Sequence, residues 1–305
     1  MIHIACCIDD AFTSHCGILI VSICENRGLE PIHFHVLTDG LDTSNEKLLK
    51  DIVTRYGQLI TVYKIDKKDL GNCPIRKNDH VSIAAYFRIL LPMIIPSFIH
   101  KILYLDCDMV VLGDLECLWN INIEDNSVGV IPDMFNHDIR IYNRLDYEMG
   151  LGYFNSGVLL VNLDYWRSKN LSDDILEYID RNPEKLKYWD QDALNYVLKD
   201  KKINMPLRFN VQDGFYWKDP FVAKKCWEEM YEAAADPVVL HYTGYIKPWY
   251  KECDHPKKDL YMKYKSLSPW KHQKIGHLRL LLRVRCLILK LLIGLGIMSS
   301  RSNYR

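Results

Sequence analysis

Residues 101–111 read KILYLDCDMVV, two apolar runs that enclose Asp106-Cys107-Asp108. The first run has the length and composition of a buried β-strand. Two neighbouring carboxylates repel each other unless a cation or several donors neutralise them. The chain has two copies of the Asp-x-Asp pattern, at 106–108 and 190–192, which is about the number expected by chance. The pattern alone is therefore uninformative. Its position between two apolar runs is what favours a divalent metal site, for Mg²⁺ or Mn²⁺.

On both sides of this stretch, short apolar runs alternate with helical stretches. Strands are predicted at 2–8, 32–37, 58–65, 101–105, 127–131, 157–163 and 238–242. Helices are predicted at 14–26, 42–56, 83–95, 164–181 and 191–199. Continuous apolar strands are typical of a sheet covered on both faces. The alternation therefore predicts an α/β fold with a mixed, mostly parallel sheet and helices on both faces.

The composition is that of a globular protein and excludes several classes. The chain has 305 residues, of which 49% are hydrophobic and 26% charged. A disordered chain, a collagen-like repeat and a multi-span membrane protein are thereby excluded. Ten cysteines include no Cys-x-x-Cys pair, and the first residues lack a basic segment and a cleavage site. We therefore expect reduced thiols, no signal peptide and a cytoplasmic protein.

Polar residues stand at the ends of several predicted strands, where open α/β sheets bind their ligands. They are Asp9 and Asp10 after the first strand, Asp106 and Asp108 after 101–105, Asp133 after 127–131, and Asn155 with Ser156 before 157–163. Asp133 can also be read as a turn residue. Side chains at one edge of a sheet converge, so we expect a single polar crevice.

Six motifs follow one another in order. They are Asp9-Asp10, HVSI continuing to YFR (80–88), KILYLDCDMVV, FNSGV (154–158), DQD (190–192), and HYTG with KPW (241–249). The series, from about residue 2 to about 255, resembles glycosyltransferase family 8, in particular the bacterial α-galactosyl- and α-glucosyltransferases that extend lipopolysaccharide or lipooligosaccharide. The resemblance implies a GT-A fold, a UDP-sugar donor, Mn²⁺ (or Mg²⁺) and transfer with retention of anomeric configuration.

The resemblance also implies roles by position. Asp106, Asp108 and His241 would bind the metal. Cys7, Asp9, Phe12, His80 and Val81 would line the uridine pocket, with Ala11 standing where the family often has Asn. Gly244 and Lys247 would approach the diphosphate. Arg88, Asn155, Asp190 and Gln191 would contact the donor sugar, with Gln191 nearest the anomeric carbon. Cys107, Asp133 and Ser156 complete the expected substrate-binding residues, Asp133 on the acceptor side or supporting the site.

Structural roles compete with some of these assignments. Asp190 and Asp192 open a predicted helix, where Asp caps free N–H groups, and we expect a mostly structural role for Asp192. His241 taken alone can be a buried core histidine, and Arg88 can pair with a surface carboxylate. Gln191 is a poor nucleophile, which favours departure of UDP and attack on the same face. A covalent intermediate on Asp190 is the alternative.

Two other functions compete with glycosyl transfer. A sugar-nucleotide pyrophosphorylase needs a Gly-rich loop after its first strand, where this chain has CIDDAF. A catalytically silent membrane-associated scaffold would keep the fold without the site. Intact Asp106, Asp108 and His241 argue against that scaffold.

The C-terminal region has a different charge from the rest of the chain. After Asp259 there are ten Lys and Arg and no acidic residue, although the net charge of the whole chain is zero. We therefore divide the chain into a catalytic domain (1–258) and a basic, Leu-rich tail (259–305). Residues 277–297 predict an amphipathic helix that is too short to span a bilayer.

The tail predicts a membrane partner. A basic amphipathic helix without acidic residues favours the surface of an anionic membrane, here through 271–298. The alternative is packing of this helix on the catalytic domain or on a partner protein. No nucleic-acid partner is expected, because the Leu-rich stretch 277–297 has no Phe, Tyr or Trp between its charges for base stacking and the rest of the chain is acidic. We expect an enzyme on the cytoplasmic face of the cell membrane with an oligosaccharide or glycolipid acceptor.

Overall fold

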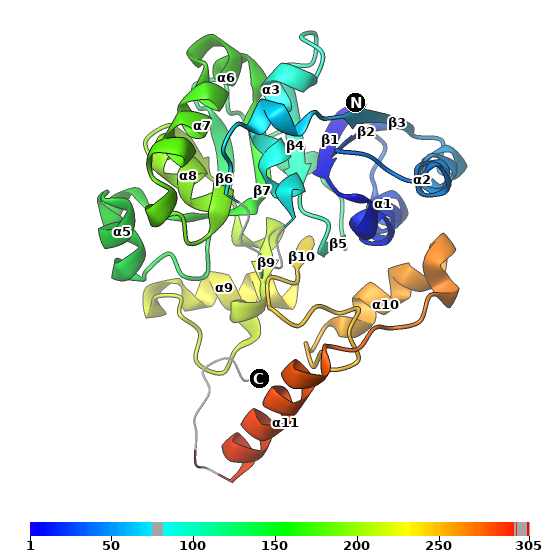
Figure 1. Ribbon diagram of the computed structural model, residues 1–305, viewed down its shortest axis with the longest axis vertical. Coiled ribbons are helices and arrows are strands. Elements are labelled where there is room, and N and C mark those ends of the chain that lie inside the picture. The colour runs from blue at the N-terminus through cyan, green and yellow to red at the C-terminus, as the bar shows by residue number, and fades with distance from the viewer. Residues whose placement is uncertain (75–81, 296, 298–303, 305) are drawn as a thin grey trace.

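A seven-stranded mixed sheet forms the centre of the molecule (Figure 1). The computed structural model describes residues 1–74, 82–295, 297 and 304. The strand order is β3-β2-β1-β4-β7-β6-β8, and the strands are β1 (Ile2–Cys7), β2 (Ile32–Thr38), β3 (Leu59–Lys64), β4 (Lys101–Leu105), β6 (Val128–Pro132), β7 (Phe154–Asn162) and β8 (Lys202–Asn204). Only β7 runs antiparallel to its neighbours β4 and β6. The predicted α/β fold with a mixed, mostly parallel sheet is confirmed.

A second, three-stranded sheet extends the first at the edge where β4 ends. It has the order β5-β10-β9, with β5 (Met109–Val111), β10 (Val239–His241) and β9 (Val211–Gln212). Strand β10 pairs antiparallel with β5, so that His241 lies opposite Met109. This pairing brings a late part of the chain against the turn that follows β4.

Helices cover both faces of the large sheet, as the continuous apolar strands predict. Helices α1 (Thr13–Asn26) and α2 (Thr43–Arg55) pack on the face formed by Ile4, Phe34 and their neighbours. The opposite face packs against a 3₁₀ helix (Ile83–Leu90) and against α3 (Leu91–Ile94), α6 (Leu163–Lys169), α7 (Leu171–Arg181) and α8 (Trp189–Leu198). The shorter helices are α4 (Glu116–Trp119), α5 (Ile139–Leu145) and α9 (Trp227–Ala235).

Two predicted helices are wrong in detail. The segment 83–95 forms a 3₁₀ helix followed by one short α-helical turn. Pro92 has no N–H to donate to the carbonyl four residues before it, which disfavours a continuous α-helix. The predicted helix 164–181 is interrupted at Asn170, whose φ of 51° is left-handed. Asn tolerates this conformation better than most residues, so one helix ends there and another begins.

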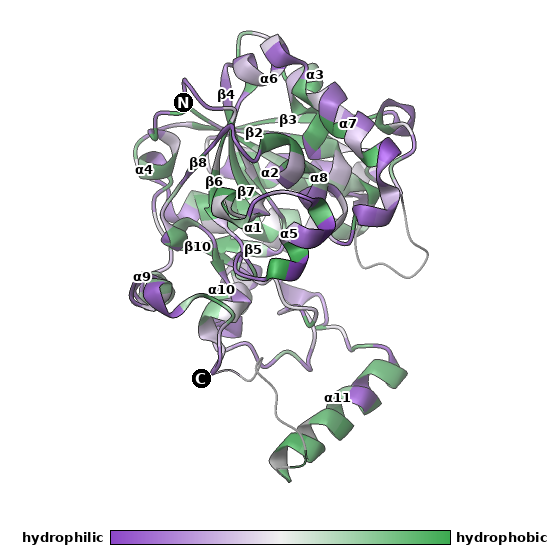
Figure 2. Ribbon diagram, turned by 90° about the vertical axis from the view of Figure 1, so that its left-hand side faces the viewer, coloured by the Kyte–Doolittle hydropathy of each residue, from purple (hydrophilic) through white to green (hydrophobic). Residues whose placement is uncertain are grey.

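The C-terminal region has two parts. Helix α10 (Lys258–Leu267) packs on α1, with Tyr261 and Tyr264 buried and the Tyr264 hydroxyl 2.7 Å from Asn26 Nδ2. Helix α11 (Leu280–Gly294) stands away from the sheet (Figures 1 and 2). Among the described residues, no helix is long and apolar enough to cross a membrane. The predicted tail therefore begins with a helix that is part of the core packing.

Candidate active site

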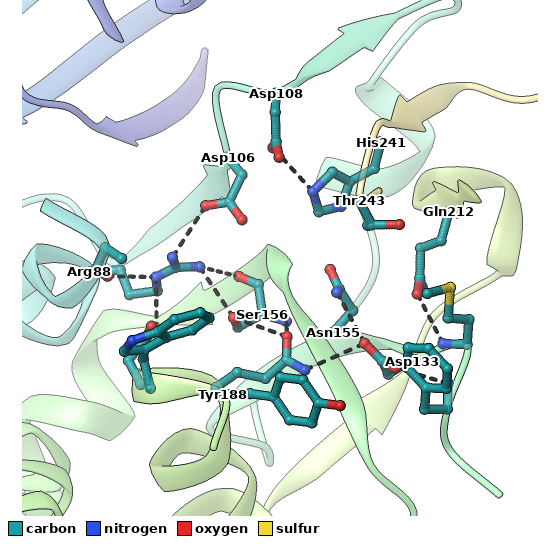
Figure 3. A pocket seen from close by; sticks show the side chains of 16 residues that line it. Arg88, Asp106, Asp108, Asp133, Asn155, Ser156, Tyr188, Gln212, His241 and Thr243 are labelled. Atoms are coloured by element: carbon teal, nitrogen blue, oxygen red, sulfur yellow. Dashed lines mark hydrogen bonds and ion pairs between the residues drawn. The ribbon is translucent and has the colours of Figure 1, made fainter. Parts of the chain in front are cut away.

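A polar cleft of about 240 Å³ opens at the edge where β4 ends and β7 begins (Figure 3). Because β7 runs antiparallel to β4, the first residues of β7 lie at the same edge as the last residues of β4. The structure brings nine of the predicted site residues into the lining of this cleft: Arg88, Asp106, Asp108, Asp133, Asn155, Ser156, Asp190, Gln191 and His241. Five of the seven polar residues at the strand ends therefore meet in one crevice, whereas Asp9 and Asp10 do not line it.

Asp106, Asp108 and His241 form a compact group of possible metal ligands. One ligand atom from each lies within 4.8 Å of the others. Asp108 Oδ1 is 3.0 Å from His241 Nε2, and Asp108 Oδ2 is 2.7 Å from the Lys247 ammonium. Burial raises the pKa of Asp108, but Lys247 and His241 outweigh it and hold that pKa well below its usual range. Asp108 is therefore ionised at neutral pH.

A chain of amides fixes the orientation of the His241 ring. The backbone N–H of Gly157 and Asn210 Nδ2 both donate to Asn155 Oδ1, at 3.1 and 2.9 Å. Asn210 Oδ1 is thus left to accept from His241 Nδ1, at 2.9 Å. The other ring nitrogen, Nε2, consequently faces a carboxylate oxygen of Asp108. An imidazole nitrogen and a carboxylate oxygen placed in this way are suited to share a cation, and this orientation is the kind that supporting residues give to metal-binding histidines.

Asp106 has one oxygen that has no hydrogen-bond partner within the described part of the chain and is therefore available to a ligand. Its Oδ1 accepts from the Tyr104 hydroxyl at 2.6 Å and lies 3.2 Å from Arg88. Its Oδ2 lies beside Gly157, where an added Cβ would be 2.8 Å from that oxygen and 2.5 Å from His241 Cε1. Two carboxylates and one imidazole suit a divalent cation such as Mn²⁺. The residues present therefore fit the implied metal.

We predict that Gly157→Ala weakens Mn²⁺ binding at least about tenfold. The new methyl group would push the His241 ring and Asp106 apart, and the Gly157 carbonyl is held by the Asp106 N–H at 2.9 Å, so the strand cannot simply move away. Electron paramagnetic resonance of free Mn²⁺ during a titration would measure the change. Gly150→Ala is the matched control, because its Cβ would meet nothing within 4 Å. An unchanged Mn²⁺ affinity in Gly157→Ala would contradict the assignment.

Arg88 connects the metal-ligand group to helix α8. Its side chain is 5% exposed and pairs with Asp106 at 3.2 Å and with Asp190 Oδ2 at 2.9 Å. It also donates to the Ser156 carbonyl at 2.6 Å. Burial raises the pKa of Asp190 to about 6, although the Arg88 charge opposes that rise. One buried cation thus holds two carboxylates that would otherwise repel each other.

Gln191 is fixed at the floor of the cleft. Its Oε1 accepts from the Ser156 N–H at 3.0 Å, and its Nε2 donates to the Tyr153 hydroxyl at 3.1 Å and to Asp133 Oδ2 at 3.3 Å. The same Asp133 oxygen accepts from Asn155 Nδ2 at 3.1 Å. Burial raises the pKa of Asp133. Asp133 therefore supports Asn155 and Gln191 from the floor of the site.

The first turn of α8 has an unusual backbone. Trp189, just before Asp190, has a φ of 48°, a left-handed value that is costly for a bulky residue. Asp192 is fully buried and accepts from the N–H groups of Lys187 and Tyr188, both at 2.7 Å, and from Arg144. The structural role predicted for Asp192 is confirmed. Its bonds hold the turn that directs Asp190 and Gln191 into the cleft.

Other predicted residues lie near the cleft without lining it. Cys7 ends β1, and Asp9 accepts from the Phe12 N–H at 3.1 Å. Phe12 packs edge-on against Trp249, which stacks on His15. His80 and Val81 fall outside the described residues.

Cys107 and Gly244 each contact residues that do not line the cleft. The Cys107 thiol points away from the cleft to Cys6 and Cys16. Gly244 lies against Asp213, where a Cβ would be 2.2 Å from a carboxylate oxygen. The side chain of Lys247, another predicted residue that does not line the cleft, contacts the metal-ligand group through Asp108.

Several lining residues were not among those predicted from the sequence. They are Ala85, Met134, Phe135, Tyr188, Trp189, Gln212 and Thr243. Gln212 shows the reason, because it comes from β9 in the second sheet, accepts from the Met134 N–H at 2.8 Å and donates to the Pro132 carbonyl at 2.9 Å. Gln212 thus enters the site through the pairing of a strand only two residues long, which has no periodicity to detect.

Comparison with known proteins agrees with this geometry. The family model described as glycosyl transferase family 8 matches residues 3–253. The chain is 30% identical to general stress protein A of Bacillus subtilis, covering 88% of this chain and 95% of that protein. It is 29% identical to lipopolysaccharide 1,3-galactosyltransferase of Salmonella typhimurium, covering 88% and 79%.

A solved structure has the same fold. The crystal structure of the galactosyltransferase LgtC with donor and acceptor sugar analogs superposes with a TM-score of 0.80 at 25% identity, covering 88% of this chain and 96% of that one. The GT-A fold expected from the motifs is therefore confirmed. The match of the family model over most of the chain makes the protein a glycosyltransferase and a member of glycosyltransferase family 8.

Proposed function

We propose that the protein is a metal-dependent, retaining hexosyltransferase that moves galactose or glucose from a UDP-sugar to a saccharide acceptor. The observation that carries this proposal is that Asp106, Asp108 and His241 form a compact group in a cleft that Arg88 and Gln191 also line. Lipopolysaccharide galactosyl- and glucosyltransferases among the relatives support the choice of hexose and of a lipid-linked, cell-surface acceptor.

The metal-ligand group has the chemistry needed for a departing diphosphate. Asp106, Asp108 and His241 would hold a Mn²⁺ ion, which would supply Lewis-acid chemistry and neutralise the charge on the departing UDP. Lys247, 2.7 Å from Asp108, adds a positive charge at the same place. Gly244 remains a proposed backbone contact to the diphosphate, although the Asp213 carboxylate occupies the place that a side chain would take at this residue.

The part of the cleft lined by Asp190 and Gln191 suits the donor sugar. The Gln191 amide is held by Ser156, Tyr153 and Asp133, so it presents a fixed, neutral and weakly nucleophilic group to the anomeric carbon. Asp190 is bound to Arg88, which reduces its nucleophilicity. These contacts favour front-face attack, with the departing phosphate oxygen taking the acceptor proton, over a covalent intermediate on Asp190. Trapping of a glycosylated Asp190 would overturn this mechanism.

The loop after β1 favours this function over that of a pyrophosphorylase. A triphosphate is normally bound by free backbone N–H groups in a Gly-rich loop. Here the loop contains no glycine, and the Asp9 carboxylate already accepts from the Phe12 N–H. Asp9, Phe12 and Cys7 remain our proposed contacts to the uridine.

The direct test measures UDP release from a panel of UDP-sugars, first with Mn²⁺ and then with excess chelator. We expect release from one hexose donor and loss of that release on chelation. Mixed oligosaccharide acceptors are included so that a missing acceptor does not hide activity. Absence of release from every donor would favour the silent scaffold instead.

We also propose that α11 holds the enzyme on an anionic membrane, near a lipid-linked acceptor on the cytoplasmic face. Figure 2 shows α11 as a largely hydrophobic helix that stands away from the sheet. Its large apolar side chains are strongly exposed, among them Leu281 (85%), Leu287 (67%) and Leu291 (62%). Arg285 is also exposed, whereas Arg283 pairs with Glu252 at 2.9 Å and ties the helix to the catalytic domain. Apolar side chains beside basic ones are typical of helices that lie at the lipid interface.

We predict that Leu287→Glu lowers binding to vesicles of phosphatidylcholine and phosphatidylglycerol at least about tenfold. A charged group in the apolar face must stay out of the lipid and is repelled by anionic headgroups. Co-sedimentation with vesicles measures the effect. Leu29→Glu is the matched control, since Leu29 is 96% exposed on the catalytic domain. Equal losses for both variants would show that α11 is not the membrane contact.

A further inference from the structure

Three histidines converge on the sheet away from the cleft. His33 and His35 are two residues apart on β2 and therefore point to the same face. His3 lies on the neighbouring strand β1, in register with His33. One ring nitrogen from each lies within 4.8 Å of the others. They occupy the face opposite to α1 and α2, because Ile4 and Phe34, which alternate with them, pack against those helices.

The spacing of the ring nitrogens is close to the spacing that ligands have around one metal ion. His3 Nδ1 is 3.0 Å from His35 Nε2. Nitrogens that share a tetrahedral zinc ion at 2.0–2.1 Å lie about 3.4 Å apart, so a small adjustment would admit the ion. The fully buried His35 is therefore held close to the position that a ligand needs.

Hydroxyl groups on β3 hold the outer side of two rings. The Tyr63 hydroxyl is 3.0 Å from His35 Nδ1, and the Thr61 hydroxyl is 2.9 Å from His33 Nε2. An acceptor on one ring nitrogen fixes the proton there and leaves the other nitrogen with a free lone pair. Thr61 and Tyr63 lie beside His35 and Leu37 in the β2–β3 register, so the whole arrangement belongs to three rigid strands.

The protonation state agrees with a metal site. Burial lowers the pKa of His3 to about 4, assisted by neighbouring His33, and burial also lowers the pKa of His35 to about 3. The imidazoles are therefore neutral at physiological pH, which is the form that binds metals.

We propose that His3, His33 and His35 form a second metal site, for Zn²⁺ or a similar transition ion, separate from the Mn²⁺ site in the cleft. A group of three neutral imidazoles binds Zn²⁺ in preference to Mg²⁺ or Mn²⁺, which favour oxygen ligands. His3 and His33 are only partly buried, so a fourth coordination position is accessible to water or to a small anion. The site lies toward the beginning of β1 and β2, about 13 Å along the strand from Cys7 at the cleft end.

The test is a titration with Co²⁺, a coloured substitute for Zn²⁺, followed by competition with Zn²⁺. It uses the full chain without a polyhistidine tag, in an Asp108→Ala background that disables the metal-ligand group of the cleft. We expect one equivalent of Co²⁺ to bind and to be displaced by Zn²⁺. Adding His33→Gln should weaken binding at least about 100-fold, and Tyr63→Phe should weaken it about tenfold through loss of the outer hydrogen bond.

Two controls separate this site from other sources of binding. His272→Gln changes an exposed histidine elsewhere and should leave the titration unchanged. Cys16→Ser disrupts the buried group of Cys6, Cys16 and Cys107, which would bind Co²⁺ with an intense sulfur charge-transfer band. The proposal fails if the Asp108→Ala protein binds no Co²⁺, if His33→Gln binds it equally well, or if binding shows the sulfur band and disappears in Cys16→Ser. Thermal unfolding without metal checks that each variant is folded.

Discussion

Asp108→Ala is expected to lower metal-dependent turnover at least about 10³-fold, which corresponds to about 4 kcal/mol of transition-state stabilisation. The substitution removes both oxygens that face His241 Nε2 and the Lys247 ammonium, at 3.0 and 2.7 Å. His241 and the Lys247 ammonium are then left without the carboxylate that lies between them. UDP release over a range of Mn²⁺ concentrations measures the loss, and excess Mn²⁺ should not restore it.

The fold should survive this substitution. The Asp108 carbonyl still accepts from the Tyr242 N–H at 3.0 Å, so the β5–β10 pairing keeps its backbone bonds. Circular dichroism and thermal unfolding check this expectation. Asp125→Ala, at an exposed carboxylate, serves as the matched control and should retain full turnover. Unchanged turnover in Asp108→Ala would rule out the metal assignment.

Arg88→Met should have the largest effect on stability, a loss of about 3–5 kcal/mol in the free energy of unfolding. Arg88 is the buried cation between Asp106 and Asp190, and a methionine of similar length leaves both carboxylates without it. Turnover should also fall sharply, because the Ser156 carbonyl loses its donor and the floor of the cleft loses its shape. Denaturant unfolding monitored at pH 8 measures the change.

The pH dependence of the stability loss in Arg88→Met distinguishes the loss of the buried positive charge from a simple loss of packing. Removing Arg88 takes away the charge that lowers the pKa of Asp190, so the folded-state pKa rises further above about 6. A carboxyl whose folded pKa is raised destabilises the protein above that pKa, and the cost disappears as the pH falls toward the unfolded value. Arg88→Met should therefore be less destabilising at pH 5 than at pH 8. Equal losses at both pH values, or a similar loss in the exposed control Arg140→Met, would contradict this account.

Long, continuous apolar segments were predictable from the sequence. Strands β1, β2 and β4 lie within about one residue of their predicted bounds, because buried parallel strands leave a strong apolar signal. The strand predicted at 238–242 corresponds to β10, but the sequence could not predict that it pairs with β5 and β9 in a separate sheet, since segments of two or three residues carry almost no pattern. The interruption of the 164–181 helix depended on one left-handed residue, Asn170, which is compatible with a helix by composition.

The residues of the candidate site also fall into those that could be predicted from the sequence and those that could not. Residues within motifs, such as Asp106, Asp108 and Arg88, were identified and do meet in one cleft. The residues that orient them were missed: Asn210 fixes the His241 ring, and Tyr104 binds one oxygen of Asp106. Asn and Tyr are common in ordinary cores, and only the folded positions of these two reveal what they hold. Sequence thus identifies the reacting groups more readily than the groups that support them.

The pairing of β10 with β5 has a consequence for synthesis of the chain. The large sheet needs nothing beyond β8, which ends at Asn204, whereas His241 joins Asp108 only after β10 has been made. At the usual pace of translation, His241 leaves the ribosome on the order of ten seconds after Asp108. A nascent or truncated chain can therefore hold its main sheet while lacking a ligand of the cleft. Catalytic competence would be the last property this protein acquires, and products of incomplete translation would be folded in part but inactive.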